Sequence, residues 1–261
     1  DDVLTRVTNP EGGTMDVAYT PSTQYRNEQG VLLNMVAFVL HTVSRIERDD
    51  RVGTRSTESY VYEGGAMYVD SADVYKNTFA GFAHVTRTSG EGDKTSEQFT
   101  VDEYPLLGRM YRRDVFEGDG SRLKSVFLNY SHADLAGSRY LVKLDSEVSK
   151  LYDPAGAARV SAIGYEYDLN GNIRTQTEFG EVSLVDDTGA FADIGEDKKS
   201  SDFSYAVDAN GRIRNAVATA TRRDFAGNRI SELHTLYDGN LNNAVSRGNR
   251  TKSEQWSGGN S

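Results

Sequence analysis

The chain of 261 residues contains no cysteine, only four prolines and a single tryptophan. Without cysteine, disulfide bonds, thiolate metal sites and cysteine catalysis are excluded, so burial and sheet hydrogen bonds must hold the fold together. The redox compartment is left open, since cysteine-free chains occur in every compartment. The longest apolar stretch, residues 31–40, is interrupted by Asn34. It falls short of the roughly 20 apolar residues that span a membrane, so we expect no membrane span.

Basic charge is also in short supply. There are 29 lysines and arginines against 39 acidic residues, for a net charge of −10. Nucleic acid needs a basic face, and so does electrostatic docking on anionic lipid. The charge therefore argues against both partners and fits a soluble surface or secreted protein. The N-terminus does not resemble a signal peptide, and both ends read as mid-protein sequence. We expect the chain to be a fragment of a longer protein.

Tyrosine and glycine, by contrast, are abundant, with 15 and 25 residues, while the hydrophobic fraction is only 37%. This composition is typical of many short strands joined by glycine turns. We expect each tyrosine to pack its ring against a sheet and to leave its hydroxyl in water. No convincing amphipathic helix of four turns is found, so the fold class predicted is all-β.

A repeated unit is the most informative feature of the sequence. In residues 167–172 a strand ends in Tyr-Asp and passes through a glycine-containing tight turn into a second strand. The pattern returns in residues 203–213 and, in degraded form, in residues 223–230. The Asp before the turn can accept hydrogen bonds from turn amides, and the Gly can take positive φ at the tip. Repetition of this kind predicts an extended sheet whose function belongs to the whole surface.

Alternating polar and apolar residues predict the other strands. Val43 and Ile46 are one residue out of phase, which predicts a β-bulge. Two hairpins are expected from strand pairs joined by glycine-containing turns. The predicted strands are residues 15–20, 41–48, 57–63 (closed by Gly64 and Gly65), 79–88 paired with 94–101, 110–116 paired with 123–130, 139–152 and 160–167, and the acidic stretch 182–199 is predicted to be a loop.

No linker separates domains. We therefore expect a β-hairpin sheet over residues 1–160 and a repeat-like β segment over residues 161–261, continuous with the first part.

Metal-binding chemistry has little support. The histidines are His41, His84, His132 and His234, and no two have helical ligand spacing, whereas a catalytic zinc site needs three converging ligands. An acidic cluster offers oxygen ligands that suit Ca²⁺, but the EF-hand pattern is absent. A solvated acidic loop and a weak Ca²⁺ site both stay open for this cluster, which consists of Asp186, Asp187, Asp193, Glu196, Asp197 and Asp202.

Catalytic signals are equally sparse. No GxSxG elbow occurs, and a glycosidase carboxylate pair is set by distance in space, so sequence singles out none. A phosphate cradle needs a following helix. Glycines 90, 92, 118 and 120 lie in predicted hairpin turns without one. The sequence therefore predicts no catalytic, cofactor-binding or metal-binding residue, no cofactor, and a protein that is not an enzyme.

The Tyr-Asp units resemble the Rhs or YD repeats of bacterial polymorphic toxins, insecticidal toxin complexes and animal teneurins. Further stretches resemble the B component of insecticidal toxin complexes around the start of its repeats, namely residues 9–25, 79–85, 107–112, 236–239 and 246–256. There are departures from the pattern. Val207 replaces the Tyr of one unit, and Asp224 precedes the aromatic Phe225 in another. The segment that carries the family's autoproteolytic aspartates has no counterpart here.

In that family a long sheet spirals into a hollow shell around a toxic C-terminal polypeptide. The resemblance implies a large curved antiparallel sheet of successive hairpins, which forms a wall segment of such a shell in a secreted or cell-surface bacterial toxin. Its partners would be the rest of an Rhs-type polypeptide or other toxin-complex subunits, because open sheet edges must be continued.

Two alternatives stay open. One is an adhesion or carbohydrate-binding module that contacts a cell-surface glycan or receptor through a groove lined by several coplanar tyrosines. The other is a glycosidase or lyase on a β scaffold, which would need two carboxylates that converge in a cleft.

Overall fold

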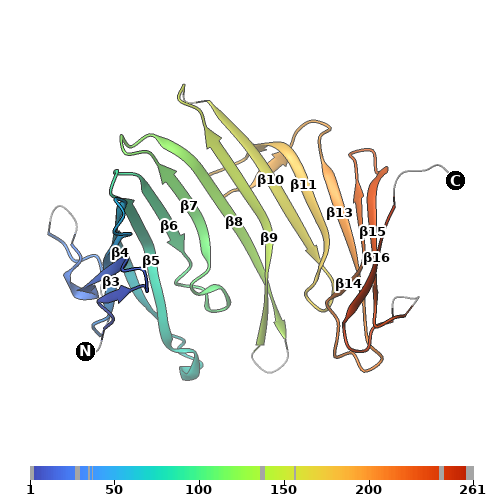
Figure 1. Cartoon of the computed structure of the whole chain (residues 1–261), viewed down its shortest axis with the longest axis horizontal. Coiled ribbons are helices and arrows are strands. Elements are labelled where there is room, and N and C mark those ends of the chain that lie inside the picture. Colours follow the sequence, from blue (N-terminus) through green and yellow to red (C-terminus); the bar gives the residue numbers. More distant parts are fainter. Residues whose placement is uncertain are drawn as a thin grey trace. The chain divides into compact units, whose positions relative to one another are not determined.

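A computed structural model describes residues 3–26, 30–34, 36, 38–135, 139–155, 157–240 and 244–256. In this part of the chain there are sixteen β-strands and three 3-10 helices of three residues each, and no α-helix (Figure 1). Within the same residues, no helix has the length and apolar character needed to cross a membrane.

The strands follow one another closely along the chain. The strands are β1 (Arg6–Thr8), β2 (Thr14–Pro21), β3 (His41–Asp49), β4 (Arg55–Tyr68), β5 (Thr78–Ser89), β6 (Lys94–Phe99), β7 (Met110–Phe116), β8 (Arg122–Leu135), β9 (Arg139–Tyr152), β10 (Ala158–Tyr167), β11 (Ile173–Leu184), β12 (Phe191–Asp193), β13 (Lys199–Ala206), β14 (Ala216–Arg223), β15 (Arg229–Tyr237) and β16 (Arg250–Gln255). The 3-10 helices are η1 (Ser22–Gln24), η2 (Val74–Lys76) and η3 (Tyr104–Leu106).

Strands that are neighbours in sequence are neighbours in the sheet. The order runs from β1 to β11 and then from β13 to β16, with β12 paired to β11. Short turns allow only antiparallel neighbours, and the two predicted hairpins form as β5–β6 and β7–β8. The predicted all-β fold, an antiparallel sheet of successive hairpins, is confirmed.

Two compact units divide the chain. Unit 1 comprises Asp1–Phe127 with Lys150–Ala158, and unit 2 comprises Leu128–Ser149 with Arg159–Ser261.

The predicted bulge lies in unit 1, between β2 and β3. Ala18 pairs with Arg45 and Tyr19 pairs with Val43, so Ser44 has no partner opposite it. The bulge explains why Val43 and Ile46 are out of phase, since one extra residue turns the following side chains to the other face.

The predicted strand end at Gly64 and Gly65 is wrong, because β4 continues to Tyr68. Gly64 has φ +65, and a Cβ there would lie 2.8 Å from the Cβ of Ala83. Its amide donates to the carbonyl of Leu33 at 2.9 Å. The glycines therefore do not break the strand; they let another segment approach its backbone closely.

That segment lies between β2 and β3 and is anchored by Asn34, which is 3% exposed. The Asn34 Nδ2 atom donates to the carbonyls of Ser22 at 3.1 Å and Tyr62 at 2.9 Å. Its Oδ1 atom accepts from the amide of Gly65 at 2.8 Å. The residue that interrupts the apolar stretch is thus the one that fastens it to β4. Residues 35 and 37 of this stretch lie outside the described residues.

Aromatic rings pack around this anchor. Ring centroids lie 5.8 Å apart for Tyr25 and Tyr62, 5.0 Å for Tyr62 and Phe82, 5.6 Å for Phe79 and Phe82, and 5.5 Å for Phe38 and Phe79. Burial raises the pKa of Tyr62 to about 12. This cluster supplies unit 1 with apolar contacts that a single sheet lacks.

In unit 2, the prediction of a loop over residues 182–199 is wrong. β11 extends to Leu184 and pairs with β12 through Val182 opposite Asp193 and Leu184 opposite Phe191. Val182 is 3% exposed, and the ring of Phe191 lies 5.0 Å from that of Phe179. The acidic residues belong to the turn of a short hairpin formed by β11 and β12, and the apolar residues of this hairpin pack on the sheet.

Candidate functional site

The Tyr-Asp turns of unit 2 have the predicted geometry. The Asp168 carboxylate accepts from the amides of Asn170 and Asn172, each at 2.8 Å. Gly171 has φ +82, and its amide donates to the Asp168 carbonyl at 3.1 Å. Burial raises the pKa of Asp168, but these hydrogen bonds outweigh it and hold the pKa below its ordinary value.

The same arrangement returns twice. Asp208 accepts from the amide of Ile213 and Asp224 from that of Asn228, each at 2.8 Å. Here the hydrogen bonds themselves are the largest cause that lowers the pKa of each carboxyl group. The degraded units thus keep the Asp-to-amide bond although their aromatic residue has changed.

A fourth turn begins at Asp238, which the sequence indicated only through its similarity to toxin components. Its backbone is left-handed, with φ +56, a conformation that Asp tolerates. Backbone amides point to its carboxylate and hold its pKa well below the ordinary value. The donors are Ser246 at 2.7 Å, Arg247 at 2.8 Å, Asn249 at 3.0 Å and Gly248 at 3.2 Å.

The expectation that the tyrosine hydroxyls lie in water is wrong for these units. Each hydroxyl donates to a backbone carbonyl of the preceding strand of the sheet, so the tyrosine joins two strands. The bonds are Tyr167 to Leu144 at 2.8 Å, Tyr205 to Ile173 at 2.7 Å and Tyr237 to Val217 at 2.9 Å. Where Tyr directly precedes Asp, as in Tyr167-Asp168 and Tyr237-Asp238, the pair therefore serves the sheet twice, because Tyr ties adjacent strands and Asp closes the turn; Tyr205 makes the same tie from three residues before Asp208.

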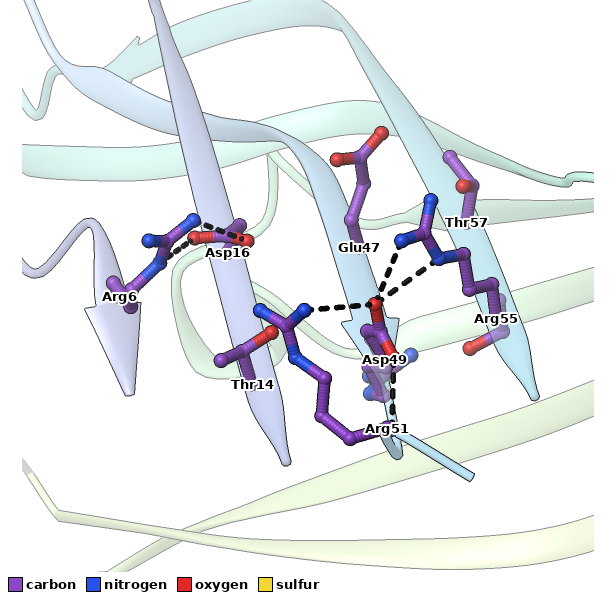
Figure 2. Close-up of a pocket in the computed structure, with 10 residues that line it drawn as sticks. Arg6, Thr14, Asp16, Glu47, Asp49, Arg51, Arg55 and Thr57 are labelled. Atoms are coloured by element: carbon purple, nitrogen blue, oxygen red, sulfur yellow. Dashed lines mark hydrogen bonds and ion pairs between the residues drawn. The ribbon is translucent and has the colours of Figure 1, made fainter. Parts of the chain in front are cut away.

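Unit 1 contains an ionic cleft of about 340 Å³ at the ends of β1 to β4 (Figure 2). The sequence did not indicate it, because its residues come from four strands and only pairing brings them together. It is lined by Arg6, Thr14, Asp16, Glu47, Arg48, Asp49, Arg51, Arg55, Ser56 and Thr57.

Ion pairs cross this cleft from strand to strand. Arg6 binds Asp16 with two nitrogens, at 2.5 and 2.9 Å. Arg55 lies 3.0 Å and Arg51 4.0 Å from the Asp49 carboxylate, as Figure 2 shows. The amide of Arg51 also donates to Asp49 at 2.8 Å and is the largest cause that lowers the Asp49 pKa.

The cleft has little catalytic capacity. The Arg6 and Arg55 side chains are 61% and 79% exposed, so solvent screens their ion pairs. Its lining offers hydroxyl groups but no histidine. Its carboxylates pair with arginines, Asp16 with Arg6, Asp49 with Arg55, and Glu47 with Arg45. We interpret it as a set of ties between strand ends.

The structure places the four histidines on four different strands. His41 lies on β3, His84 on β5, His132 on β8 and His234 on β15. Nowhere in the described ranges do three or more His, Asp or Glu side chains gather in a way that could hold a metal ion.

The acidic residues of the predicted loop are engaged separately. Asp187 and Glu196 are exposed, and each of the other four has its own partner. Asp186 accepts from Thr188 at 2.8 Å, Asp193 lies 3.9 Å from Lys198, Asp197 accepts from the amide of Glu181 at 3.0 Å, and Asp202 lies 3.2 Å from Arg223.

The glycine turns have the predicted form. Gly92 and Gly120 have φ +97 and +90, and their amides donate to Ser89 and Glu117 at 3.0 and 2.9 Å. These turns join strands, and no helix follows them.

Comparison with known proteins places these features in context. Residues 1–111 match a family described as the insecticide toxin TcdB middle/N-terminal region. No curated protein matches the chain in sequence.

Among solved structures, the crystal structure of TcdB2-TccC3 without its hypervariable C-terminal region matches with a TM-score of 0.68. The alignment covers 96% of this chain and 18% of that one, at 12% sequence identity. This chain therefore spans about a fifth of the length of that protein, and the two share a fold. A porin-like protein from Bacteroides uniformis matches over 96% of this chain and 91% of its own at 10% identity, with a TM-score of 0.30, too low to show a common fold.

The predicted similarity to the B component of insecticidal toxin complexes is thus confirmed, by the family match over residues 1–111 and by the shared fold over 96% of the chain.

Proposed function

We propose that the chain is a structural wall segment of an Rhs/YD-repeat β-shell that encapsulates a toxin or effector polypeptide. One observation supports this above all: in the described residues the sheet grows by successive hairpins and ends in two exposed strands. Among the residues that the structure describes, β1 pairs with β2 alone and β16 with β15 alone, and all residues of β1 and β16 are exposed. Such edges invite further pairing, and natural proteins cover or continue them.

The remaining parts of the proposal follow from this role. The partners are the rest of a larger Rhs-type polypeptide or other subunits of a toxin complex, and the protein is secreted or held on the bacterial surface. Residues 1–160 form the sheet that precedes the repeats, and residues 161–261 form the repeat-like part. A wall needs no catalytic group, so we propose that this segment is not an enzyme.

Protease protection in the complete protein tests the proposal. We expect the polypeptide that follows the wall to be cleaved far more slowly in the intact protein than when it is expressed alone. Val148 lies in β9 and is fully buried. Val148→Pro removes a sheet donor from the middle of a strand and should expose the enclosed polypeptide. Leu169→Pro is the control, because Leu169 is fully exposed at a turn position where proline is tolerated.

The wall role would be contradicted if the polypeptide that follows the wall were cleaved at the same rate in the intact protein as when it is expressed alone. This outcome would decide against the proposal whatever the result for the two proline variants.

The carbohydrate-binding alternative requires several coplanar tyrosines along a groove. The groove across β4 to β7, of about 520 Å³, contains one, Tyr60, beside Arg87 and Arg113. Binding of the chain to a glycan array would support this alternative, and silence across a broad array would count against it.

A further inference from the structure

The tyrosine ties of unit 2 connect one strand to the next in a fixed order. Tyr167, the last residue of β10, pairs in register with Ile173, the first residue of β11. The Ile173 carbonyl accepts the hydroxyl of Tyr205 at 2.7 Å, and Tyr205 lies in β13, on the other side of β11. The residue opposite one tyrosine thus accepts the hydroxyl of the next tyrosine.

The same order holds one step further along the sheet. Tyr205 pairs in register with Val217 on β14, and the Val217 carbonyl accepts the hydroxyl of Tyr237 on β15 at 2.9 Å. The pairing register shifts directly before each of the tyrosines Tyr167, Tyr205 and Tyr237. The same irregularity therefore accompanies each tyrosine, and the three positions in the sheet correspond to one another.

The last tyrosine of the series faces Arg250. Tyr237 pairs in register with Arg250, the first residue of β16, as Tyr167 pairs with Ile173. The turns before Arg250 and Ile173 also close in the same way, because in each the amide of the Asp donates at 2.8 Å to the carbonyl of the residue just before the new strand. Arg250 is therefore the counterpart of Ile173, and its carbonyl is the next acceptor in the series.

The described residues contain no tyrosine that could complete the series. Within them β16 pairs with β15 alone, so its outer edge has no neighbour there. The two edge strands, β1 and β16, have the sequences RVT and RTKSEQ, without tyrosine. Edge-to-edge contact between two copies of the chain therefore does not supply the missing hydroxyl. A backbone carbonyl has two lone pairs, so Arg250 can accept a hydroxyl in addition to a ladder bond.

We propose that β16 binds an antiparallel strand that carries a tyrosine, and that the hydroxyl of this tyrosine donates to the Arg250 carbonyl. The inference rests on the proposed function, since the strand belongs to the rest of the larger Rhs-type polypeptide. It adds to that function the side chain by which the next strand is recognised and the atom that receives it.

The tyrosine supplies the register that β16 lacks. All six residues of β16 are polar and exposed. Main-chain hydrogen bonds give affinity when a strand is added to such an edge. They do not fix the register, because a strand that is polar on both faces specifies its pairing weakly. A hydroxyl that reaches one particular carbonyl selects a single register.

Binding of a synthetic strand to the full chain tests the proposal. The probe is a peptide with the sequence of residues 229–238, because this segment comprises β15 and ends in Tyr-Asp. The matched control is the same peptide with Tyr237→Phe, which keeps the ring and every backbone donor. We expect the tyrosine peptide to bind at least about threefold more tightly than the control, since the control lacks one hydrogen bond to a backbone carbonyl.

Selective labelling for NMR observes the acceptor itself. With carbon-13 at the arginine carbonyl and nitrogen-15 in threonine, only Arg-Thr peptide groups give HNCO cross-peaks, and these are Arg87-Thr88, Arg174-Thr175 and Arg250-Thr251. The first two lie in β5 and β11, which have neighbours on both sides, and serve as references. We expect the tyrosine peptide to shift the carbonyl resonance of Arg250 more than the phenylalanine peptide does and to leave both references unchanged.

The proposal is overturned if the two peptides bind equally or shift the Arg250 carbonyl equally. If neither free peptide binds, each is joined to the end of the full chain by a Gly-Ser linker, which raises its effective concentration. An Arg250 resonance that is the same in the two fusions then rejects the proposal. An Arg250 resonance that moves with chain concentration in the absence of peptide shows that a second copy occupies the edge, and it rejects the proposal too.

This test and the protease test of the wall can fail separately. Slow cleavage of the enclosed polypeptide together with equal binding of the two peptides retains the wall and rejects the tie at Arg250. Tyrosine-selective binding together with unprotected cleavage retains the tie and rejects the wall.

Discussion

Unit 1 and unit 2 hold their backbone together in different ways. Both units contain turns in which an Asp carboxylate binds an amide a few residues ahead, such as Asn172 after Asp168 in unit 2 and Thr54 after Asp50 in unit 1. Unit 1 adds a buried amide, Asn34, which bonds to groups 12, 28 and 31 residues away. The Asp turn is short-range and repeated, whereas the Asn34 anchor is long-range and belongs to one place in unit 1.

The difference between the Asp turn and the Asn34 anchor explains which of the two can be repeated along a growing sheet. A turn that satisfies its own amides needs little loop closure, so it can be copied along a chain at low entropic cost. The Asn34 anchor requires a loop to fold back onto β4 and a glycine pair to receive it. It therefore gives a unique local structure that cannot be repeated from hairpin to hairpin. Three substitutions test this contrast.

The largest effect is expected for Asn34→Leu. It leaves two carbonyls and the Gly65 amide without partners in a buried site, at a cost of about 3 kcal/mol or more. Hydrogen exchange should show lost protection of the Gly64 and Gly65 amides and unchanged protection in the Tyr-Asp turns. Asn210→Leu, at an exposed turn position, should change neither. Intact protection of Gly65 in the Asn34 variant would refute the anchor.

A smaller effect is expected for Tyr205→Phe. The change removes the hydroxyl that donates to Ile173 at 2.7 Å and should cost about 1 kcal/mol. Hydrogen exchange in β11 and β13 reports it. Tyr75→Phe, at a position 95% exposed, is the control, and an equally small effect at both positions would show that the tyrosine tie does not stabilise the sheet.

The smallest effect concerns acid sensitivity. Hydrogen bonds from Arg247, Ser246, Asn249 and Gly248 hold the Asp238 pKa below its ordinary value. A depressed pKa gives stability that is present above the unfolded value of about 3.9 and is lost as the pH falls below it. The urea midpoint should therefore fall between pH 6 and pH 3.

Fluorescence of Trp256, the single tryptophan, reports this transition, because its ring lies 4.1 Å from Arg229 in unit 2. Asp238→Asn keeps the tolerance for a left-handed backbone but removes the charge, so it should lower the midpoint at pH 6 and flatten its pH dependence. An unchanged slope would show that the carboxylate bonds do not stabilise this turn.

The bulge near Val43 and the turns at Asp168 and Asp208 could be predicted from sequence because each depends on residues next to one another. A break in the alternation of polar and apolar residues predicts the bulge, and an Asp three residues before a Gly predicts the turn. The continuation of β4 through Gly64 could not be predicted. In sequence a glycine pair indicates the end of a strand, and only the structure shows that the segment around Asn34 packs against these two glycines. The ionic cleft could not be predicted either, because its residues come from four strands and only strand pairing brings them together.

Local order in the sequence thus determined the all-β class, the hairpins and the Asp turns, because side-chain alternation and turn chemistry act over a few residues. Only the tertiary structure decided where strands continue past a glycine and which polar groups from distant parts of the chain become partners. It directed Asn34 to β4 and the Tyr205 hydroxyl to Ile173. The physical reason is that hydrogen bonds and charge effects depend on distances of a few ångströms, which strand pairing sets between residues far apart in the chain.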